Sequence, residues 1–264
     1  MQYATLAHMD ILHALILGAI QGLTEFLPIS SSGHLILVPR FLGWEDQGLA
    51  FDTAVHLGTL LAVVWAFRTR LFSLVRNIAS SSEEQQLLKN LVLATIPAGI
   101  AGLAFGDVVE STLRSPLIVG ASLILWGIVL WWVDRKSENT TSHTPTMRTW
   151  LFVGIAQALA LIPGTSRSGI TVTAGLAQKL SRAQAVELSF LLSIPIIAAA
   201  GISQIVDVGV TSLFTAPMVL GILSAAISGF LAIRILEHIA RTRSLAPFAY
   251  YRVILGVIVL VVFW

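Results

Sequence analysis

Two apolar stretches of the chain each contain a single charged residue, and the two charges have opposite sign. Between residues 11 and 38 the only Asp, Glu, Lys or Arg is Glu25, and between residues 150 and 178 it is Arg167. An ionised group in hydrocarbon costs several kcal/mol, so it is retained where it has a partner or a task. We therefore expect both residues to be functional.

Both charges lie beside proline, glycine and a run of hydroxyl groups. Glu25 precedes Pro28-Ile-Ser-Ser-Ser-Gly-His34, and Arg167 lies within Pro163-Gly-Thr-Ser-Arg-Ser-Gly169. Helix N-termini bind anions, and an arginine makes paired contacts to phosphate oxygens. The serines are also typical helix caps, but a charge in both segments favours a diphosphate site. The predicted binding residues are Gln21, Ser30, Ser32, Gly33, Gly164, Thr165, Ser166, Ser168 and Gly169.

The first segment also contains a candidate nucleophile and base. His34 lies three residues after Ser31, close enough around a turn to accept the hydroxyl proton. Serine is a weak nucleophile until an adjacent base activates it. There are two alternatives: His34 is the nucleophile itself, or it is a histidine that is hydrogen-bonded within the bundle. His13 and His56 lack such neighbours and are interpreted as structural.

Glu25 has three alternative roles. Gln21 and Glu25 are four residues apart and so share one face of a helix. A carboxylate near phosphates suggests a divalent cation such as Mg²⁺ or Ca²⁺, with Glu25 as its ligand. An ion pair with Arg167 and a proton-relay role remain open beside it.

The composition indicates a membrane protein. The chain has 264 residues, of which 56% are hydrophobic and 11% charged, and its mean hydropathy is +0.85. A soluble domain carries about a quarter charged residues. The absence of cysteine excludes disulfides and thiolate metal sites. The basic residues form no stripe interleaved with aromatics, which argues against nucleic-acid binding, and the N-terminus lacks the basic start of a cleavable signal peptide.

Six segments are apolar and long enough to cross a bilayer, which takes roughly 17–25 residues. They are approximately residues 51–67, 87–105, 116–133, 183–206, 213–235 and 248–264. The two stretches with a lone charge are broken near their centres by proline and glycine. We predict that both are re-entrant helix hairpins, because broken backbone at membrane depth needs protein or a wet cavity around it.

The basic residues then predict the orientation. With both stretches re-entrant, thirteen lysines and arginines fall on one side, including Arg234, Arg241, Arg243 and Arg252, and only Arg40 and Arg114 fall opposite. The positive-inside rule makes the first side cytoplasmic and places both termini outside.

The two halves of the chain are repeats. Gly18-Ala-Ile-Gln21 and Ser30-Ser-Ser-Gly33 match Gly154-Ile-Ala-Gln157 and Ser166-Arg-Ser-Gly169 at an offset of 136 residues. Each half contains one hairpin and three spans, so the second copy is upside down relative to the first. Inverted repeats place their binding site near the midplane, which brings Glu25, Ser31 and His34 near Arg167. The predicted fold is a single all-α membrane domain over residues 1–264, with repeats over about 10–133 and 150–264.

At these residues the chain resembles the bacterial undecaprenyl-diphosphate phosphatases of the bacitracin-resistance family. The family signatures correspond to Gln21 through His34 and to Pro163 through Gly169, and the resemblance covers essentially the whole chain. Gln21 stands where many members have a second glutamate, which weakens a two-carboxylate metal site.

The resemblance implies hydrolysis of a polyprenyl diphosphate lipid to the monophosphate carrier of peptidoglycan synthesis, and with it bacitracin resistance. It implies divalent-cation dependence, a location in the bacterial inner membrane, and a site open to the outer face. It assigns Ser31 or His34 as nucleophile, Glu25 as essential acid or metal ligand, and Arg167 as phosphate binder. It allows a homodimer. A transporter or flippase for the same lipid is the rival hypothesis, because an inverted repeat suits alternating access equally well.

Overall fold

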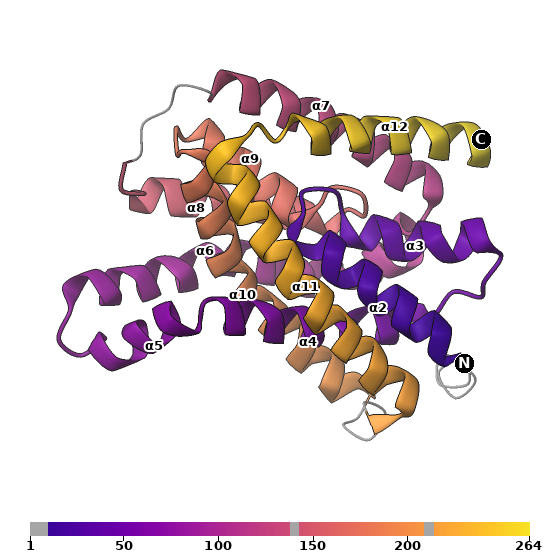
Figure 1. Ribbon diagram of the computed structural model, residues 1–264, viewed down its shortest axis with the longest axis horizontal. Helices are drawn as coiled ribbons and strands as arrows, with labels where there is room; N and C mark the ends of the chain where they lie inside the picture. Colours follow the sequence, from indigo (N-terminus) through magenta and orange to yellow (C-terminus); the bar gives the residue numbers. More distant parts are fainter. Residues whose placement is uncertain (1–9, 138–142, 209–213) are drawn as a thin grey trace.

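The computed structural model describes residues 10–137, 143–208 and 214–264, and this part of the chain is helical without a β-strand. Figure 1 shows the helices gathered into one bundle in which segments far apart in the sequence lie side by side, such as α7 (Pro116–Lys136) and α12 (Ala246–Phe263). The all-α prediction is confirmed for these residues.

Each predicted hairpin is a pair of short helices separated by a turn. The first consists of α2 (Ile11–Phe26) and α3 (Ser31–Leu42). The second consists of α8 (Met147–Ala158), a short 3₁₀ turn η2 (Leu159–Leu161), and α9 (Arg167–Ala177). The chain is non-helical at Pro28 and Pro163, where proline, which lacks the amide that a helix interior needs, is combined with hydroxyl and glycine residues; Pro39, Pro97 and Pro195 lie inside helices.

Five described helices are long and apolar enough to cross a membrane: α6 (Ser82–Val108), α7, α10 (Arg182–Val208), α11 (Ala216–Thr242) and α12. The sixth predicted span corresponds to α4 (Gly48–Ala66), which is bent by 71° from the following α5 (Arg68–Asn77). Large apolar side chains on these helices are exposed, among them Leu103 at 87% and Val261 at 76%. Exposed apolar surfaces of this kind are stable in contact with lipid, so this is a multi-pass membrane protein.

Several helices extend beyond their predicted apolar segments. Helix α6 begins five residues earlier than predicted, because Ser81 caps it by accepting a hydrogen bond from the amide of Glu84. Helix α11 continues to Thr242, past Arg234 and Glu237, which form an exposed ion pair at 3.1 Å. Hydropathy marks only the part of a helix that lies in hydrocarbon, whereas the backbone hydrogen bonds continue into the polar region.

Glycines at equivalent positions of the two repeats bring helices into close contact. A Cβ atom on Gly18 would overlap the backbone of Gly221 in α11, and one on Gly154 would overlap the backbone of Ala94 in α6. Gly120 of α7 and Gly256 of α12, which are equivalent to each other, face one another across the α7–α12 contact. Small residues of this kind let helix backbones approach in membranes.

Polar contacts join helices and loops at two opposite ends of the bundle. At one end, buried Asp134 of α7 binds Arg182 of α10 at 2.6 Å and accepts from Ser244 and the Leu245 amide before α12. At the other end, Arg114 binds Asp52 of α4 at 2.9 Å. In Figure 1, α2 begins and α12 ends on the right, whereas the α5–α6 connection lies on the left.

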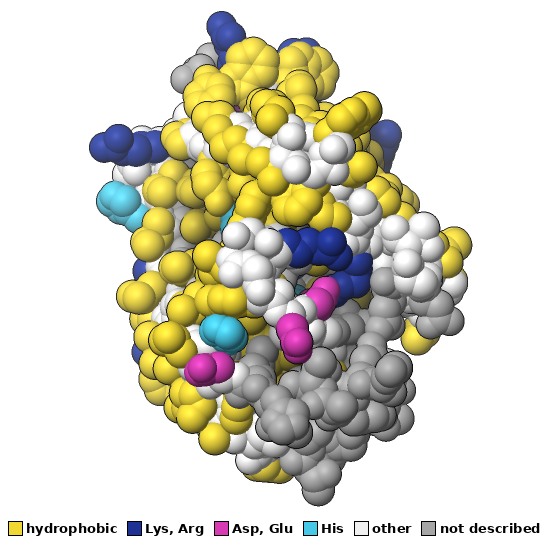
Figure 2. All heavy atoms as spheres, turned by 90° about the vertical axis from the view of Figure 1, so that its right-hand side faces the viewer, with side chains coloured by type: hydrophobic (Ala, Val, Ile, Leu, Met, Phe, Trp, Pro, Cys, Tyr) yellow, Lys and Arg dark blue, Asp and Glu magenta, His cyan; other side chains and the backbone are white. Residues whose placement is uncertain are grey.

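The right-hand end has charged side chains beside an apolar surface. Figure 2 shows this face, with basic and acidic side chains together near its centre and hydrophobic side chains above and to the left of them. Arg114, which also lies 3.4 Å from Asp46, belongs to this end. Burial lowers the pKa of the Arg114 guanidinium, but the carboxylates of Asp52 and Asp46 outweigh it and hold that pKa above its usual value.

Candidate active site

The two turns that separate the broken helices have the same backbone geometry. Ser30 and Ser166 have φ angles of 76° and 71°, a left-handed conformation that side chains rarely adopt. Each serine caps the next helix, because its Oγ accepts from the amide of Gly33 at 3.3 Å or of Gly169 at 3.0 Å. Strained backbone of this kind is concentrated at functional sites. Here it sets the direction in which α3 and α9 begin.

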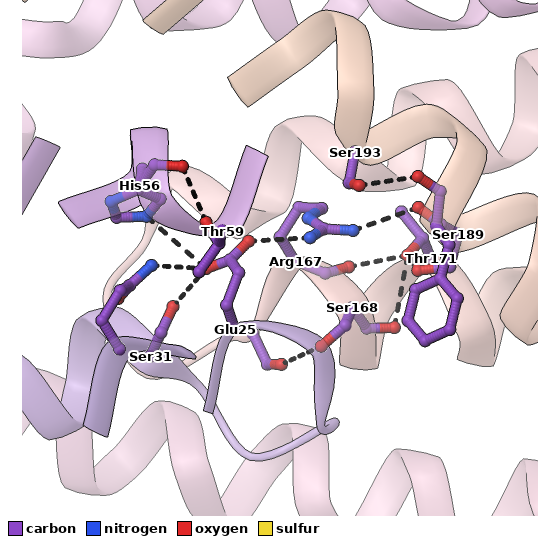
Figure 3. A network of polar contacts seen from close by, with 12 residues as sticks. Glu25, Ser31, His56, Thr59, Arg167, Ser168, Thr171, Ser189 and Ser193 are labelled. Atoms are coloured by element: carbon purple, nitrogen blue, oxygen red, sulfur yellow. Dashed lines mark hydrogen bonds and ion pairs between the residues drawn. The ribbon is translucent and has the colours of Figure 1, made fainter. Parts of the chain in front are cut away.

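Glu25 and Arg167 meet between these turns. A guanidinium nitrogen, Nη2, of Arg167 donates to Oε1 of Glu25 at 2.7 Å, and Nη1 donates to the carbonyl of Ser189 in α10 at 3.1 Å (Figure 3). The side chains are 12% and 5% exposed, so the pair is nearly dry. The predicted convergence of the lone acid and the lone base is confirmed.

Ser31 and two further side chains contact the other carboxylate oxygen. Ser31 Oγ donates to Glu25 Oε2 at 2.6 Å, and Gln21 Nε2 donates to the same atom at 3.2 Å. Figure 3 also shows the ring of His56 directed at this carboxylate, with Nε2 at 3.5 Å from Oε2. Glu25 is therefore the centre of a network drawn from α2, α3, α4 and α9.

Several polar atoms around this network have no protein partner among the described residues. They are Gln21 Oε1, Thr165 Oγ1 and Arg167 Nε, all of them buried. Buried polar groups are nearly always satisfied by protein, water or ligand. Ser31 is half-buried and 12% of the Arg167 side chain is exposed, so a ligand would reach the network on their side. The unpaired atoms and the two helix N-termini together form a site suited to a phosphorylated ligand.

His34 is placed differently from the prediction. Its Nδ1 is 2.7 Å from the carbonyl oxygen of Ser30, and its Nε2 is 2.7 Å from the hydroxyl of Tyr251 in α12. Both ring nitrogens are thus engaged, whereas the Ser31 hydroxyl is bonded to Glu25. The expected Ser31–His34 contact is wrong, because the turn at Ser30 directs Ser31 toward α2 and leaves His34 on the opposite side.

The remaining predicted residues belong to the turns themselves. Ser30 and Ser166 accept the capping bonds described above, while Ser32 and Ser168 lie 3.4 Å and 3.2 Å from them through their hydroxyl groups. Ser168 also donates to the carbonyl of Leu27 at 2.9 Å and so ties the second turn to the first. Gly164, at φ 91°, packs against Val119, where a side chain would collide.

Sequence reasoning missed two residues, His56 and Arg252. His56, interpreted as structural, contacts Glu25, and its Nδ1 is 2.5 Å from the Asp52 carbonyl. Arg252, counted among the cytoplasmic basic residues, is fully buried beneath both turns. A signal existed for Arg252, because it is the only charged residue between Ala246 and Trp264, the same pattern that identified Glu25 and Arg167.

A metal ion would have few protein ligands here. The described residues contain no cluster of three or more His, Cys, Asp or Glu side chains suited to a metal. Glu25 and the unpaired Gln21 Oε1 are nevertheless hard oxygen donors on one helix face. One carboxylate with substrate phosphates is a typical Mg²⁺ environment, so the residues fit a cation that is held jointly with a substrate.

The chain is similar to known proteins over nearly its whole length. The family model described as bacitracin resistance protein BacA matches residues 14–258. Undecaprenyl-diphosphatase 2 of Stutzerimonas stutzeri is 48% identical over 97% of this chain and 99% of its own. The undecaprenyl-diphosphatase of Campylobacter curvus is 43% identical over 97% and 100%, and that of Gemmatimonas aurantiaca is 44% identical over 95% and 97%.

Proposed function

The chain belongs to the BacA bacitracin resistance family, and we propose that it is an undecaprenyl-diphosphatase. It hydrolyses undecaprenyl diphosphate to undecaprenyl phosphate and inorganic phosphate. The observation that carries the proposal is the Glu25–Arg167 pair with the Ser31 hydroxyl on the same carboxylate. This activity recycles the lipid carrier for peptidoglycan synthesis, and removing the diphosphate form of that carrier confers bacitracin resistance.

The diphosphate is bound by Arg167 and the two helix N-termini. Arg167 provides the charge, and the first amides of α3 and α9 have no partner within their helices. The unpaired Arg167 Nε and Thr165 Oγ1 are further donors at the same place. Charge neutralisation and positioning supply most of the catalysis in phosphoryl transfer, so loss of Arg167 should cost more than loss of a flanking serine such as Ser168.

Ser31 is the proposed nucleophile and Glu25 its base. As the bond between Ser31 Oγ and the terminal phosphorus forms, the hydroxyl proton passes to Glu25 Oε2, 2.6 Å away. The bond from that phosphorus to the bridging oxygen breaks, and undecaprenyl phosphate leaves. Water then attacks the phosphoserine and releases inorganic phosphate, restoring the serine hydroxyl. His34 is a poorer nucleophile here, because both of its nitrogens are engaged.

A divalent cation fits this scheme. Glu25 and Gln21 would hold it together with the substrate phosphates. When bound, the cation reduces the repulsion between the Glu25 carboxylate and the diphosphate. The carboxylate itself still orients Ser31 and Arg167, as it does through its two oxygens.

The membrane arrangement that we propose is an inverted repeat of six spans and two re-entrant hairpins. Its support is that equivalent positions make equivalent contacts: Ser30 and Ser166 in the turns, Gly18 and Gly154 on the hairpins, and Gly120 facing Gly256. The end with Asp134 and Arg182 carries most of the basic residues and is assigned to the cytoplasm. Both termini and the end with Arg114 then lie on the outer side of the inner membrane, and the site is proposed to open on that side.

Phosphate release by the purified protein in detergent tests the function directly. Detergent abolishes any gradient, so release of phosphate from undecaprenyl diphosphate distinguishes the phosphatase from a transporter of the same lipid. Trapping the labelled protein after brief incubation should locate phosphate on Ser31, and Ser31→Ala should eliminate both label and release. Label on His34, or normal release by Ser31→Ala, would overturn the assignment of the nucleophile.

A further inference from the structure

Helix α12 places two consecutive residues against the turns of the active site. Arg252 is fully buried, and no acidic side chain of the described residues pairs with it. Its guanidinium instead donates to three carbonyl oxygens: that of Pro28 at 3.3 Å, that of Gly164 at 3.0 Å and that of Thr165 at 2.7 Å. A dry guanidinium without a counterion is costly, so it requires a specific reason to be there.

These acceptors lie in both turns at corresponding positions. Pro28 and Gly164 are equivalent in the two repeats, each two residues before the strained serine. A trans peptide group points its carbonyl and its amide in opposite directions. Arg252 therefore orients the Thr165–Ser166 peptide and holds it at a constant position relative to the first turn.

Tyr251 reaches the first turn through His34. The Ser30 carbonyl can only accept, so the neutral His34 ring carries its proton on Nδ1 and accepts from the Tyr251 hydroxyl through Nε2. The two rings are nearly parallel, at an angle of 6°. The chain of contacts from α12 thus ends on the peptide group that leads directly into Ser31.

We infer that Tyr251 and Arg252 are positioning residues that set the distance between Ser31 and Arg167 by holding the two turns together. The inference rests on the proposed function, because that distance matters only if both residues act on one substrate. It also explains what His34 does: the ring transmits the position of α12 to Ser30 and accepts no proton from Ser31. Neither α12 residue touches the reacting groups.

The chain offers a matched pair of variants for testing this. Tyr251→Phe removes only the hydroxyl that binds His34. Tyr250→Phe, one residue earlier, removes a hydroxyl that accepts from Trp131 at 3.2 Å outside the site. Both tyrosines are on the surface of α12, at 43% and 55% exposure, so both variants should fold. Misplacement of reacting groups by about 1 Å can cost 100-fold in rate.

We expect Tyr251→Phe to lower kcat for phosphate release by about 10-fold or more, with KM changed less than about 2-fold, while Tyr250→Phe leaves both unchanged. Equal kcat values for the two variants would overturn the inference. A loss that matches the loss of folded protein would also overturn it, because it would mean a merely structural role.

A second measurement is independent of the activity. Hydrogen exchange of the amides in residues 29–33 and 165–169 should be faster in Tyr251→Phe, and faster still in Arg252→Lys, than in Tyr250→Phe. Arg252→Lys retains the charge but loses the planar fork that spans three carbonyls. If the wild-type protein releases no phosphate, the proposed function fails, whereas unchanged exchange in both turns would refute the positioning role by itself.

Discussion

Replacing Arg167 separates the structural role of the Glu25 ion pair from its catalytic role. Arg167→Ala leaves the Glu25 carboxylate, which is 5% exposed, without its charged partner at 2.7 Å. Breaking a buried pair by removing one member costs about 3–5 kcal/mol. Ser31 and Gln21 still donate to the carboxylate, so we expect the lower value, about 3 kcal/mol. At roughly 2–4 °C per kcal/mol, the thermal midpoint should fall by about 6–12 °C.

The double variant Glu25→Gln/Arg167→Ala should recover most of this loss. Removing the carboxylate together with the guanidinium leaves no uncompensated charge, so we expect the midpoint to rise again by several degrees. Activity should be absent in both variants, because phosphate binding depends on Arg167. Arg234→Ala is the matched control: its ion pair with Glu237 is exposed, and such pairs contribute about 0–1 kcal/mol.

Thermal unfolding in detergent and phosphate release measured on the same samples provide the test. If the single and double variants unfold at the same temperature, the unpaired Glu25 carboxylate carries no penalty in the fold. The reasoning from burial would then be wrong. Substantial phosphate release by either variant would refute the role of Arg167 in binding.

Three further predictions concern the fold and the cation. Gly154→Ala should destabilise the protein by about 1–3 kcal/mol, because its Cβ would overlap the backbone of Ala94, whereas Gly99→Ala, with open space around it, should unfold at or above the wild-type temperature. Asp134→Asn should lower the unfolding temperature while leaving the kcat of the folded fraction unchanged, since its partner Arg182 lies at the end of the bundle away from Arg114; a lost kcat would contradict this. Gln21→Glu should reduce the Mg²⁺ concentration for half-maximal phosphate release several-fold, and chelation should stop release; an unchanged Mg²⁺ titration would argue against a cation at Glu25.

Much of the architecture is predictable because membrane insertion imposes strong local rules. A long apolar segment in a membrane is helical, and proline combined with glycine and hydroxyl residues breaks it at the two turns, whereas Pro39, Pro97 and Pro195 remain inside helices. The contact between Glu25 and Arg167 is therefore predictable from the sequence, because each charge needs a partner at membrane depth. The repeat matches Gly18 with Gly154, but only the structure shows that each lies against the backbone of another helix.

The partners of individual hydroxyl and ring groups are not predictable in this way. Spacing along the chain favours Ser31 with His34, but the positive φ of Ser30 turns the Ser31 hydroxyl toward Glu25 instead. Arg252 looks like a cytoplasmic arginine until α12 is packed against α7 and the carbonyls of both turns surround it.

The sequence by itself therefore determines which groups cannot remain unpaired in a membrane, and on which broken helices they lie. Only the tertiary structure decides which partner each group takes. The physical reason is that burial depends on composition, which is local, whereas a hydrogen bond depends on direction. In this site the directions come from two strained turns, from His56 in α4, and from α12, which is remote in sequence from the first turn that it positions.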